Sequence, residues 1–327
     1  MPPKALCVLA VFFLGGCVSF SKAPPIQLNV KNLSTEHIAE VKNLVVKLEP
    51  FIRTKDLEGK LPALTFKELE APLNSSEKQF LRSFQNLRAG EAGVRIPFRG
   101  LSQGEKDLVL LKGQKILMKG KEKEIPPQFL SPQVYQAYQF MMRAMERDIS
   151  KRLFVESGYR SSAHQLYLFI FYLSNHDYSI LETVKWVALP GYSEHGDPEH
   201  LAIDFINSDG INGEYDVTGF EVLPEYQWLL QNAGRFGFFL SYPKNSGGGI
   251  TYEPWHWFYE GTSIPNSMNP VSANNKNLIP FRTVTSPAIK VRGDTLVGRH
   301  GQASEQESSL GTHRLLNPAA SASPASR

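Results

Sequence analysis

Cysteine is scarce in this chain, and its two cysteines, Cys7 and Cys17, both lie near the N-terminus. A disulfide therefore cannot hold the body of the chain together. Lysine and arginine form no clustered stripe interleaved with aromatics, and the net charge is only +3, so we expect no nucleic-acid partner. Internal repeats and a phosphate-binding glycine loop are also absent. What remains is 327 residues, 42% of them hydrophobic, enough for one sizeable core with smaller appendages.

The first 17 residues have the pattern of a targeting segment. Lys4 precedes an apolar run, residues 5–14, that is too short to span a bilayer. Residues 14–17, Leu-Gly-Gly-Cys, resemble a bacterial lipobox, in which Cys17 becomes the lipidated first residue of the mature protein. We therefore expect a signal peptide over 1–17 and a membrane-anchored lipoprotein of the cell envelope, facing the periplasm. Val18 is not the aspartate that retains such proteins in the inner membrane, which favours the outer membrane. An ordinary signal peptide with a chance cysteine is the alternative.

Composition divides the rest of the chain into four stretches. Residues 18–26 have the composition of a tether, and residues 27–124 form an N-terminal helical and mixed region without identifiable chemistry. Within it, loosely alternating apolar residues predict a hairpin around Gly113. Residues 125–262 contain every motif discussed below. Residues 263–327 are rich in Ser, Ala, Pro and Asn without periodicity, which predicts a low-complexity, disordered tail.

Residues 125–262 begin with patterns that predict a core helix, a short strand and a second helix, with Arg160 in the turn between the strand and the second helix. After Ser131 and a proline, an apolar stripe that includes Met141 and Met145 recurs at helical spacing and predicts a core helix. Residues 153–156 then predict a short strand, and an apolar helix follows from about residue 163. Arg160 falls in the turn between them, where a fold can hold a guanidinium rigidly over a cleft. A surface ion pair is the alternative for this arginine.

Histidines and acids gather in two short runs, PGYSEHGDPEHLAIDF over residues 190–205 and YEPWHWFY over residues 252–259. A mononuclear hydrolytic zinc centre needs three nitrogen or oxygen ligands, an open fourth position for water, and usually a carboxylate beside that water. His195, Asp204 and His256, with Glu253, supply that set of residues. The sequence therefore predicts a metal site.

Three runs in order, SGYRSSAHQ, PGYSEHGDPEHLAIDF and GGGITYEPWHW, make the pattern more specific. Over residues 128–261 they resemble the zinc D-alanyl-D-alanine carboxypeptidases of the VanY type, within the lysostaphin, D-Ala-D-Ala carboxypeptidase and hedgehog fold group. The resemblance implies an α+β fold in which a small antiparallel sheet carries a zinc site and is flanked by helices. A helical N-terminal region would precede that zinc carboxypeptidase domain.

The family pattern Ser-x-His-x-x-Gly-x-Ala-x-Asp matches Ser193, His195, Ala202 and Asp204, with two residues added between the ligands. An insertion of two preserves the alternation of a strand, so a longer loop would keep the ligand pair. The same alternation places His200 on the face of Asp204 and makes it the rival ligand. We prefer His195 as the ligand, because the sequence Ser-Glu-His at residues 193–195 matches the motif usual in the family.

The resemblance also implies the roles of the site residues. One zinc ion would be held by His195, Asp204 and His256, and Glu253 would take the proton of the attacking water. Strict strand alternation would point Glu253 and His256 to opposite faces, so we expect a bend at the residue before Pro254.

Substrate contacts follow from the first and second runs. Arg160 would stabilise the oxyanion or grip a substrate carboxylate, and Ser161, Gln165 and Ser193 would lie near the same subsite. In the family the substrate is the stem peptide of peptidoglycan, which a lipid-anchored protein of the envelope would meet.

Three functions remain open at this point. The first is a D,D- or L,D-carboxypeptidase acting on stem peptides, and the second is a murein endopeptidase. The third is a catalytically degenerate lipoprotein that binds zinc or the cell wall, suggested by the altered interval between His195 and Asp204. Glu253 and Arg160 favour an enzyme, because a purely structural zinc site needs neither.

Overall fold

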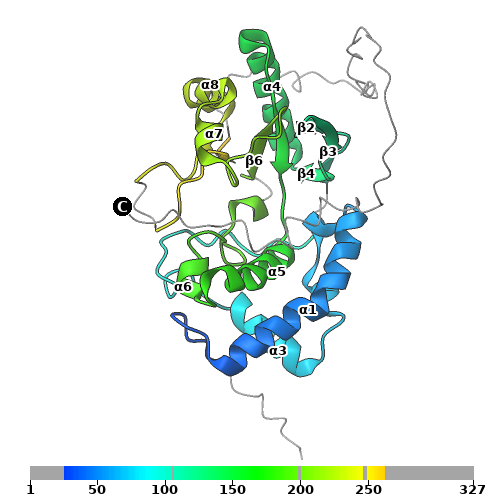
Figure 1. Ribbon diagram of the computed structural model, residues 1–327, viewed down its shortest axis with the longest axis vertical. Helices are drawn as coiled ribbons and strands as arrows, with labels where there is room; N and C mark the ends of the chain where they lie inside the picture. Colours follow the sequence, from blue (N-terminus) through cyan, green and yellow to red (C-terminus); the bar gives the residue numbers. More distant parts are fainter. Residues whose placement is uncertain (1–25, 105–106, 198–199, 246–248, 262–327) are drawn as a thin grey trace, which may run out of the picture.

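A computed structural model describes residues 26–104, 107–197, 200–245 and 249–261. The predicted signal peptide with Cys17, nearly all of the tether, Pro198 and the predicted tail lie outside these ranges. Figure 1 shows a helical half at one end of the long axis and a sheet with its own helices at the other. Within the described ranges, no helix combines the length and the apolar character needed to cross a bilayer.

The helical half is built around one apolar core. Leu48 and Ile52 of α1 are buried, and Phe84 of α3 packs against Phe169 of α5 with ring centroids 6.5 Å apart. The N-terminal region therefore shares its core with the helix that follows Arg160. The elements of this half are α1 (Thr35–Leu57), the 3-10 helix η1 (Leu61–Ala63), α2 (Phe66–Glu70), α3 (Ser75–Gln85), α5 (Ser162–Tyr172), η2 (Leu173–His176) and α6 (Ile180–Thr183).

A capping box begins α2 and links it to α1. Thr65 Oγ1 accepts a hydrogen bond from the Glu68 amide at 3.2 Å, and Glu68 Oε2 accepts one from the Thr65 amide at 2.9 Å. Lys55 Nζ reaches Glu68 Oε1 at 2.6 Å. The hydrogen bond from Lys55, assisted by those from Thr65 and opposed by partial burial, lowers the pKa of Glu68 to about 2.

Glu68→Ala is therefore expected to lower the free energy of unfolding by about 1 kcal/mol at pH 7, mostly through the lost cap. Because the folded pKa lies below the ordinary value of 4.5, this contribution is present above about pH 4.5 and is lost as the pH falls toward 2. Urea unfolding of both proteins between pH 7 and pH 3 measures the difference, with the exposed Glu91→Ala as control. A difference that does not shrink with falling pH would show that the charge of Glu68 contributes nothing.

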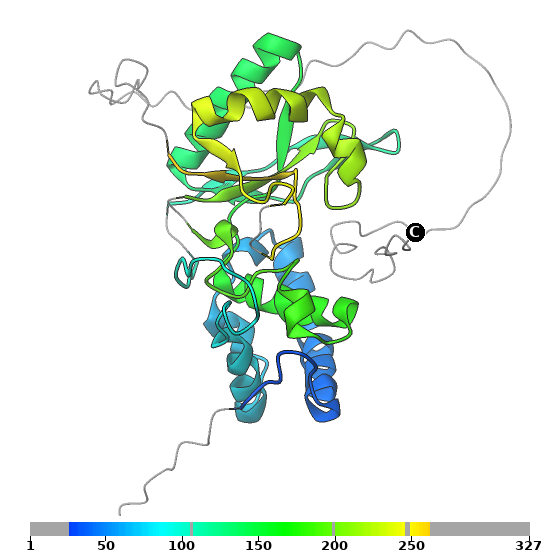
Figure 2. The same cartoon turned by 90° about the vertical axis from the view of Figure 1, so that its left-hand side faces the viewer.

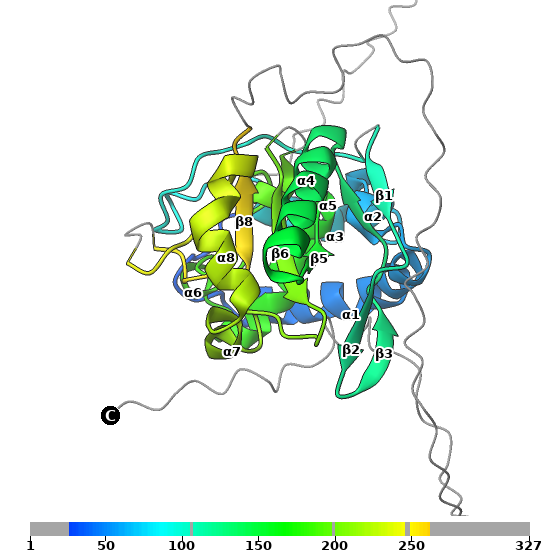
Figure 3. The ribbon, with the colours of Figure 1, turned by 90° about the horizontal axis from the view of Figure 1, so that it is seen from above.

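The other half contains a four-stranded antiparallel sheet in the order β5-β6-β8-β7. In Figure 3, α4 and α8 lie across one face of it. The predicted methionine stripe is confirmed as core, since Met141 and Met145 are buried with Ile203 and Phe205 of the sheet. The elements are β5 (Leu153–Ser157), β6 (Ala202–Asn207), β7 (Phe238–Leu240), β8 (His256–Tyr259), α4 (Pro132–Ile149), the 3-10 helix η3 (Glu194–Gly196), α7 (Val217–Glu221), α8 (Pro224–Asn232) and the 3-10 helix η4 (Ala233–Phe236).

Strand β6 is buried on both faces. Its side chains alternate between a face that packs into the apolar core and a face that carries the polar residue Asp204. Ile203 and Phe205 belong to the core shared with α4 and α8. Because successive side chains of a strand point to opposite faces, Ala202 and Asp204 turn the other way, toward the helical half. Figure 2 shows the sheet between α4 and α8 on one side and the helical half on the other. The observed fold is α+β with a small antiparallel sheet, as predicted.

The predicted hairpin around Gly113 is wrong. Strand β2 (Lys115–Met118) pairs with β3 (Lys121–Glu124) across a two-residue turn. There Lys119 and Gly120 have φ values of +52° and +76°, as a tight hairpin turn requires. Strand β1 (Val109–Leu111) instead pairs with β4 (Gln128–Leu130), so the chain around Gly113 connects two separate ladders.

Candidate metal centre

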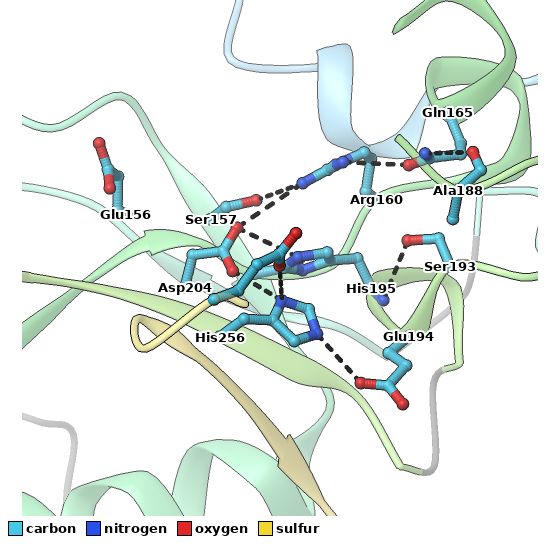
Figure 4. Close-up of polar contacts among 12 residues, drawn as sticks. Glu156, Ser157, Arg160, Gln165, Ala188, Ser193, Glu194, His195, Asp204 and His256 are labelled. Atoms are coloured by element: carbon cyan, nitrogen blue, oxygen red, sulfur yellow. Dashed lines mark hydrogen bonds and ion pairs between the residues drawn. The ribbon is translucent and has the colours of Figure 1, made fainter. Parts of the chain in front are cut away.

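Three polar side chains form a row across the middle of the sheet. Asp204 on β6 is the register partner of Ser157 on β5 and of His256 on β8. Directly opposed residues of antiparallel strands place their side chains on one face, close enough to interact. Asp204 Oδ1 lies 2.8 Å from His256 Nδ1. The strand register alone therefore brings together two of the three predicted ligands (Figure 4).

His195 reaches the same place from η3, beneath the sheet. Its Nε2 lies 3.1 Å from Asp204 Oδ2, and its Nδ1 lies 2.8 Å from the carbonyl oxygen of Gly158. A carbonyl only accepts, so Nδ1 is the nitrogen that carries hydrogen. Burial lowers the pKa of His195 despite the neighbouring Asp204, which favours the neutral ring. The lone pair of Nε2 then faces a carboxylate oxygen.

Burial and mutual contact set the charges of the other two residues. Burial favours the neutral form of Asp204, but His195 and His256 beside it hold its pKa well below the ordinary range. Burial likewise disfavours the charged form of His256, yet its hydrogen bonds to Asp204 and Glu194 outweigh burial and raise its pKa to about 10. A buried anionic carboxylate thus lies between two imidazoles.

This set of donors fits a zinc ion. One ligand atom from each of His195, Asp204 and His256 lies within 4.8 Å of the other two, and all three residues are buried. Two acceptors that face each other, Nε2 of His195 and Oδ2 of Asp204, are satisfied together by a cation. Two imidazoles and one carboxylate are also three nitrogen and oxygen ligands, the number that catalytic zinc sites take from the protein.

Glu253 lies in the turn that leads into β8. The backbone amide of His256 donates to the Glu253 carbonyl at 3.2 Å, which closes the turn across Pro254. This is the bend that the sequence required, and it places Glu253 Oε2 3.9 Å from His256 Nδ1. Burial raises the pKa of Glu253 to about 8, although the nearby His256 opposes the shift. A carboxylate of this kind can exchange a proton near neutral pH.

Arg160 occupies the predicted turn between β5 and α5 and points toward the cluster. Its Nη2 donates to Ser157 Oγ at 3.0 Å and lies 3.8 Å from Asp204 Oδ2, while Nη1 donates to Gln165 Oε1 at 3.0 Å. Gln165 in turn donates to the Ala188 carbonyl at 2.7 Å. These contacts hold the guanidinium at the edge of the cluster, as Figure 4 shows.

The structure shows the intramolecular contacts of the three other residues that were predicted to lie near the substrate. Ser161 is fully buried, and its hydroxyl accepts from the His164 amide at 3.2 Å as the N-cap of α5. Ser193 is the N-cap of η3 and accepts from the His195 amide at 3.3 Å. Gln165 is buried and uses both ends of its amide, as described above. All three side chains therefore have partners within the fold, and their contacts with a substrate stay predictions.

The rival ligand His200 lies away from the cluster. Strand β6 begins at Ala202, so the alternation that aligned His200 with Asp204 does not extend to it. Its side chain is 46% exposed, and its ring centroid is 6.4 Å from that of Phe258. His195, not His200, is the residue that the fold brings to Asp204.

The sequence analysis missed three residues around the cluster, of which Glu194 and Tyr242 contact His256 and Arg99 contacts Glu194. Glu194 Oε2 lies 3.0 Å from His256 Nε2, and Arg99 Nη2 lies 2.7 Å from Glu194 Oε1. The ring of Tyr242 stacks on His256 with centroids 5.1 Å apart. Glu194 had a signal, its position directly before His195, whereas no pattern in the sequence marked Arg99.

The chain is similar to known proteins over the part that carries these residues. The family model VanY, D-alanyl-D-alanine carboxypeptidase, matches residues 127–262. A D-alanyl-D-alanine carboxypeptidase of Enterococcus faecalis is 48% identical over 82 residues, which are 24% of this chain and 27% of that protein. The chain thus spans about a quarter of that relative's length.

Two further proteins show the same similarity. The bifunctional D-Ala-D-Ala dipeptidase and carboxypeptidase VanXYC of Enterococcus gallinarum is 32% identical over 143 residues, covering 42% of this chain and 70% of that protein. The crystal structure of a vancomycin-resistance D,D-pentapeptidase, VanY, in complex with Zn(II) is 28% identical, with a TM-score of 0.36 over 51% of this chain and 87% of that one. From the family match and the coverage of VanXYC, the chain belongs to the VanY D-alanyl-D-alanine carboxypeptidase family.

Proposed function

We propose that this protein is a zinc-dependent peptidase that trims peptidoglycan stem peptides as a D,D- or L,D-carboxypeptidase. The observation that carries the proposal is the buried cluster of His195, Asp204 and His256 with two further groups, Glu253 and Arg160, beside it. A structural zinc site closes with four protein ligands. Here the fold supplies three ligands and adds a proton acceptor and a cation, which suits hydrolysis.

The chain's own residues provide the remaining parts of the mechanism. Zinc at such a site supplies Lewis-acid activation of water and of the peptide carbonyl. Glu253 would accept the proton of the attacking water and pass it to the leaving amine, because its carboxylate is buried beside the cluster, with Oε2 3.9 Å from His256 Nδ1. Asp204 remains anionic throughout.

Arg160 provides the cation that a carboxypeptidase needs. A guanidinium binds a carboxylate through two parallel hydrogen bonds, and a substrate cut near its C-terminus presents that carboxylate. Ser157 and Gln165 fix the plane of the Arg160 side chain from two sides. The same charge could stabilise the oxyanion of the transition state, where donors fixed in advance are most effective.

Digestion of purified muropeptides by the zinc-loaded protein tests this proposal, with products identified by mass. Release of one terminal D-alanine from a pentapeptide stem indicates a D,D-carboxypeptidase, and release from a tetrapeptide indicates an L,D-carboxypeptidase. Products cut within a stem or a cross-link would favour the endopeptidase. Failure to cleave any muropeptide would contradict the proposal and favour a binding protein.

The proposal extends to location, since we infer that Cys17 is lipidated and anchors the protein in the envelope. The lipobox of residues 14–17 supports this inference. Cys17→Ser is expected to leave the precursor unlipidated and to release the protein from the membrane fraction. Fractionation and mass spectrometry of the N-terminus measure both effects. A soluble wild-type protein that starts elsewhere would contradict the lipid anchor.

A further inference from the structure

A segment outside the family match lies against the metal centre. We call residues 95–103 the strap. It continues from the helical core, where Val94 is buried, and the amide of Arg99 donates to the Gly191 carbonyl at 2.7 Å. Further along, the Ser102 amide donates to Ser162 Oγ at 2.9 Å. The strap is thus fixed to the loop before η3 and to the start of α5, the two segments that present His195 and Arg160.

The approach of the strap to the loop is close. The ring of Phe98 lies 5.2 Å from that of Tyr192, and a Cβ atom added at Gly191 would come within 2.4 Å of Phe98. Gly191 also has a φ of +81°, which L side chains rarely adopt. The backbone at position 191 therefore favours glycine, and the strap packs directly against it.

The guanidinium of Arg99 extends from the strap to the residues beside the cluster. Its Nη2 contacts Glu194 Oε1 at 2.7 Å, its Nη1 lies 3.7 Å from Asp197 Oδ2, and its guanidinium carbon lies 4.3 Å from the ring centroid of Phe258. The side chain is only 19% exposed. A partly buried ion pair with a ring stacked on it holds a carboxylate more firmly than a surface pair does.

Glu194, held by Arg99, also contacts His256, one of the predicted ligands. Its second oxygen, Oε2, lies 3.0 Å from His256 Nε2, while His256 Nδ1 faces Asp204. A carboxylate accepts only, so Nε2 carries the hydrogen that Glu194 accepts. Nδ1 faces the Asp204 carboxylate inside the three-residue cluster, so it is the atom that would bind the metal once its own hydrogen is released. Residues that orient a ligating histidine in this way fix its tautomer and its ring, and their loss commonly weakens metal binding by about 10- to 100-fold.

We propose that Arg99 is a positioning residue for the metal centre. It holds Glu194 in the orientation that accepts from His256 Nε2, and so it fixes the ligand across an interface between the strap and the sheet. The N-terminal region then supplies part of the site rather than support alone. This inference rests on the proposed function only in assuming that the cluster binds zinc.

Full-length Arg99→Met and Glu194→Gln proteins, each purified and loaded with metal, test the proposal. Zinc affinity is measured by competition with a chelator, and the Co(II)-substituted proteins are compared by their visible absorption spectra. Arg95→Met is the matched control, because Arg95 is an exposed arginine of the same strap. Arg99→Lys keeps the charge and tests rescue.

Glu194→Gln is expected to raise the zinc Kd by about 10- to 100-fold, and Arg99→Met by about 10-fold, with a changed Co(II) spectrum in both. Arg99→Lys should recover part of the loss, and Arg95→Met should match wild type. In the Glu194→Gln background, Arg99→Met should change the zinc Kd by less than about twofold, because the two residues act in series.

The results separate this inference from the proposed function. If wild type binds zinc and cleaves muropeptides while Arg99→Met leaves the zinc Kd and the Co(II) spectrum unchanged, the positioning role is overturned alone. Fully additive effects of the two substitutions would also overturn it, as would a loss of thermal stability without any change in metal affinity. If wild type binds no zinc, both proposals fail.

Discussion

Glu253→Gln is expected to bind zinc as wild type does, to fold normally, and to lose roughly 10²- to 10⁴-fold in hydrolysis of its muropeptide substrate. The physical reason is that Glu253 lies beside the cluster without belonging to it: its Oε2 is 3.9 Å from His256 Nδ1, and the three-ligand set is complete without it. The amide keeps the size of the side chain and removes its capacity to accept the proton.

Single-turnover rates with a defined muropeptide measure the loss of hydrolysis, and zinc content after dialysis measures whether the metal is retained. Glu260→Gln is the matched control, since Glu260 is exposed and directly follows β8. A Glu253→Gln protein that cleaves at the wild-type rate would remove Glu253 from the chemistry. One that loses its zinc would make Glu253 a ligand instead of a base.

The second large effect concerns the two histidines that compete for the ligand role. His195→Ala removes one of three buried donors and is expected to lose most of the bound zinc. His200→Ala is expected to keep the metal and to change activity only modestly, because its side chain is exposed and lies outside the cluster.

Metal analysis after dialysis against a weak chelator ranks the two variants. Each serves as the other's control, since the same substitution is made five positions apart in one loop. Zinc retained by His195→Ala and lost by His200→Ala would reverse the assignment.

Much of this site could be predicted from the sequence, because local patterns determine it. Asp204 and His256 each lie in a short apolar strand, and pairing of those strands makes them register partners. The turn across Pro254 followed from the mismatch between strand alternation and the two roles assigned to Glu253 and His256. His195 was correctly preferred over His200 from the residues of the motif. Strand alternation would have favoured His200, but β6 does not begin until Ala202.

Other features depend on tertiary contacts that no local pattern records. Arg99 and Glu194 are 95 positions apart, and nothing in the composition of the strap distinguishes Arg99 from the exposed Arg95. One position of a motif can also serve two purposes. The place of Ser161 in a family motif predicts a substrate contact, a serine before a helix is also an N-cap, and the structure shows the cap.

The hairpin error has a similar cause. Loose alternation around Gly113 is compatible with more than one pairing, and only contacts across the fold choose between them. Gln114 illustrates the choice, because its side chain donates to the Val155 carbonyl at 2.9 Å and so attaches the connection between β1 and β2 to β5. The tight turn forms instead at Lys119 and Gly120, which both have positive φ values.

His195, Asp204 and His256 together are expected to hold one zinc ion, and both the proposed hydrolysis and the proposed role of Arg99 depend on that ion. Diffraction from crystals of the zinc-loaded protein, collected on both sides of the zinc absorption edge, tests it most directly. We expect a single anomalous peak bounded by His195 Nε2, the Asp204 carboxylate and His256 Nδ1, with Glu253 beside it but not bound to it. A peak ligated by His200, or no peak at this cluster in protein that cleaves muropeptides, would contradict it.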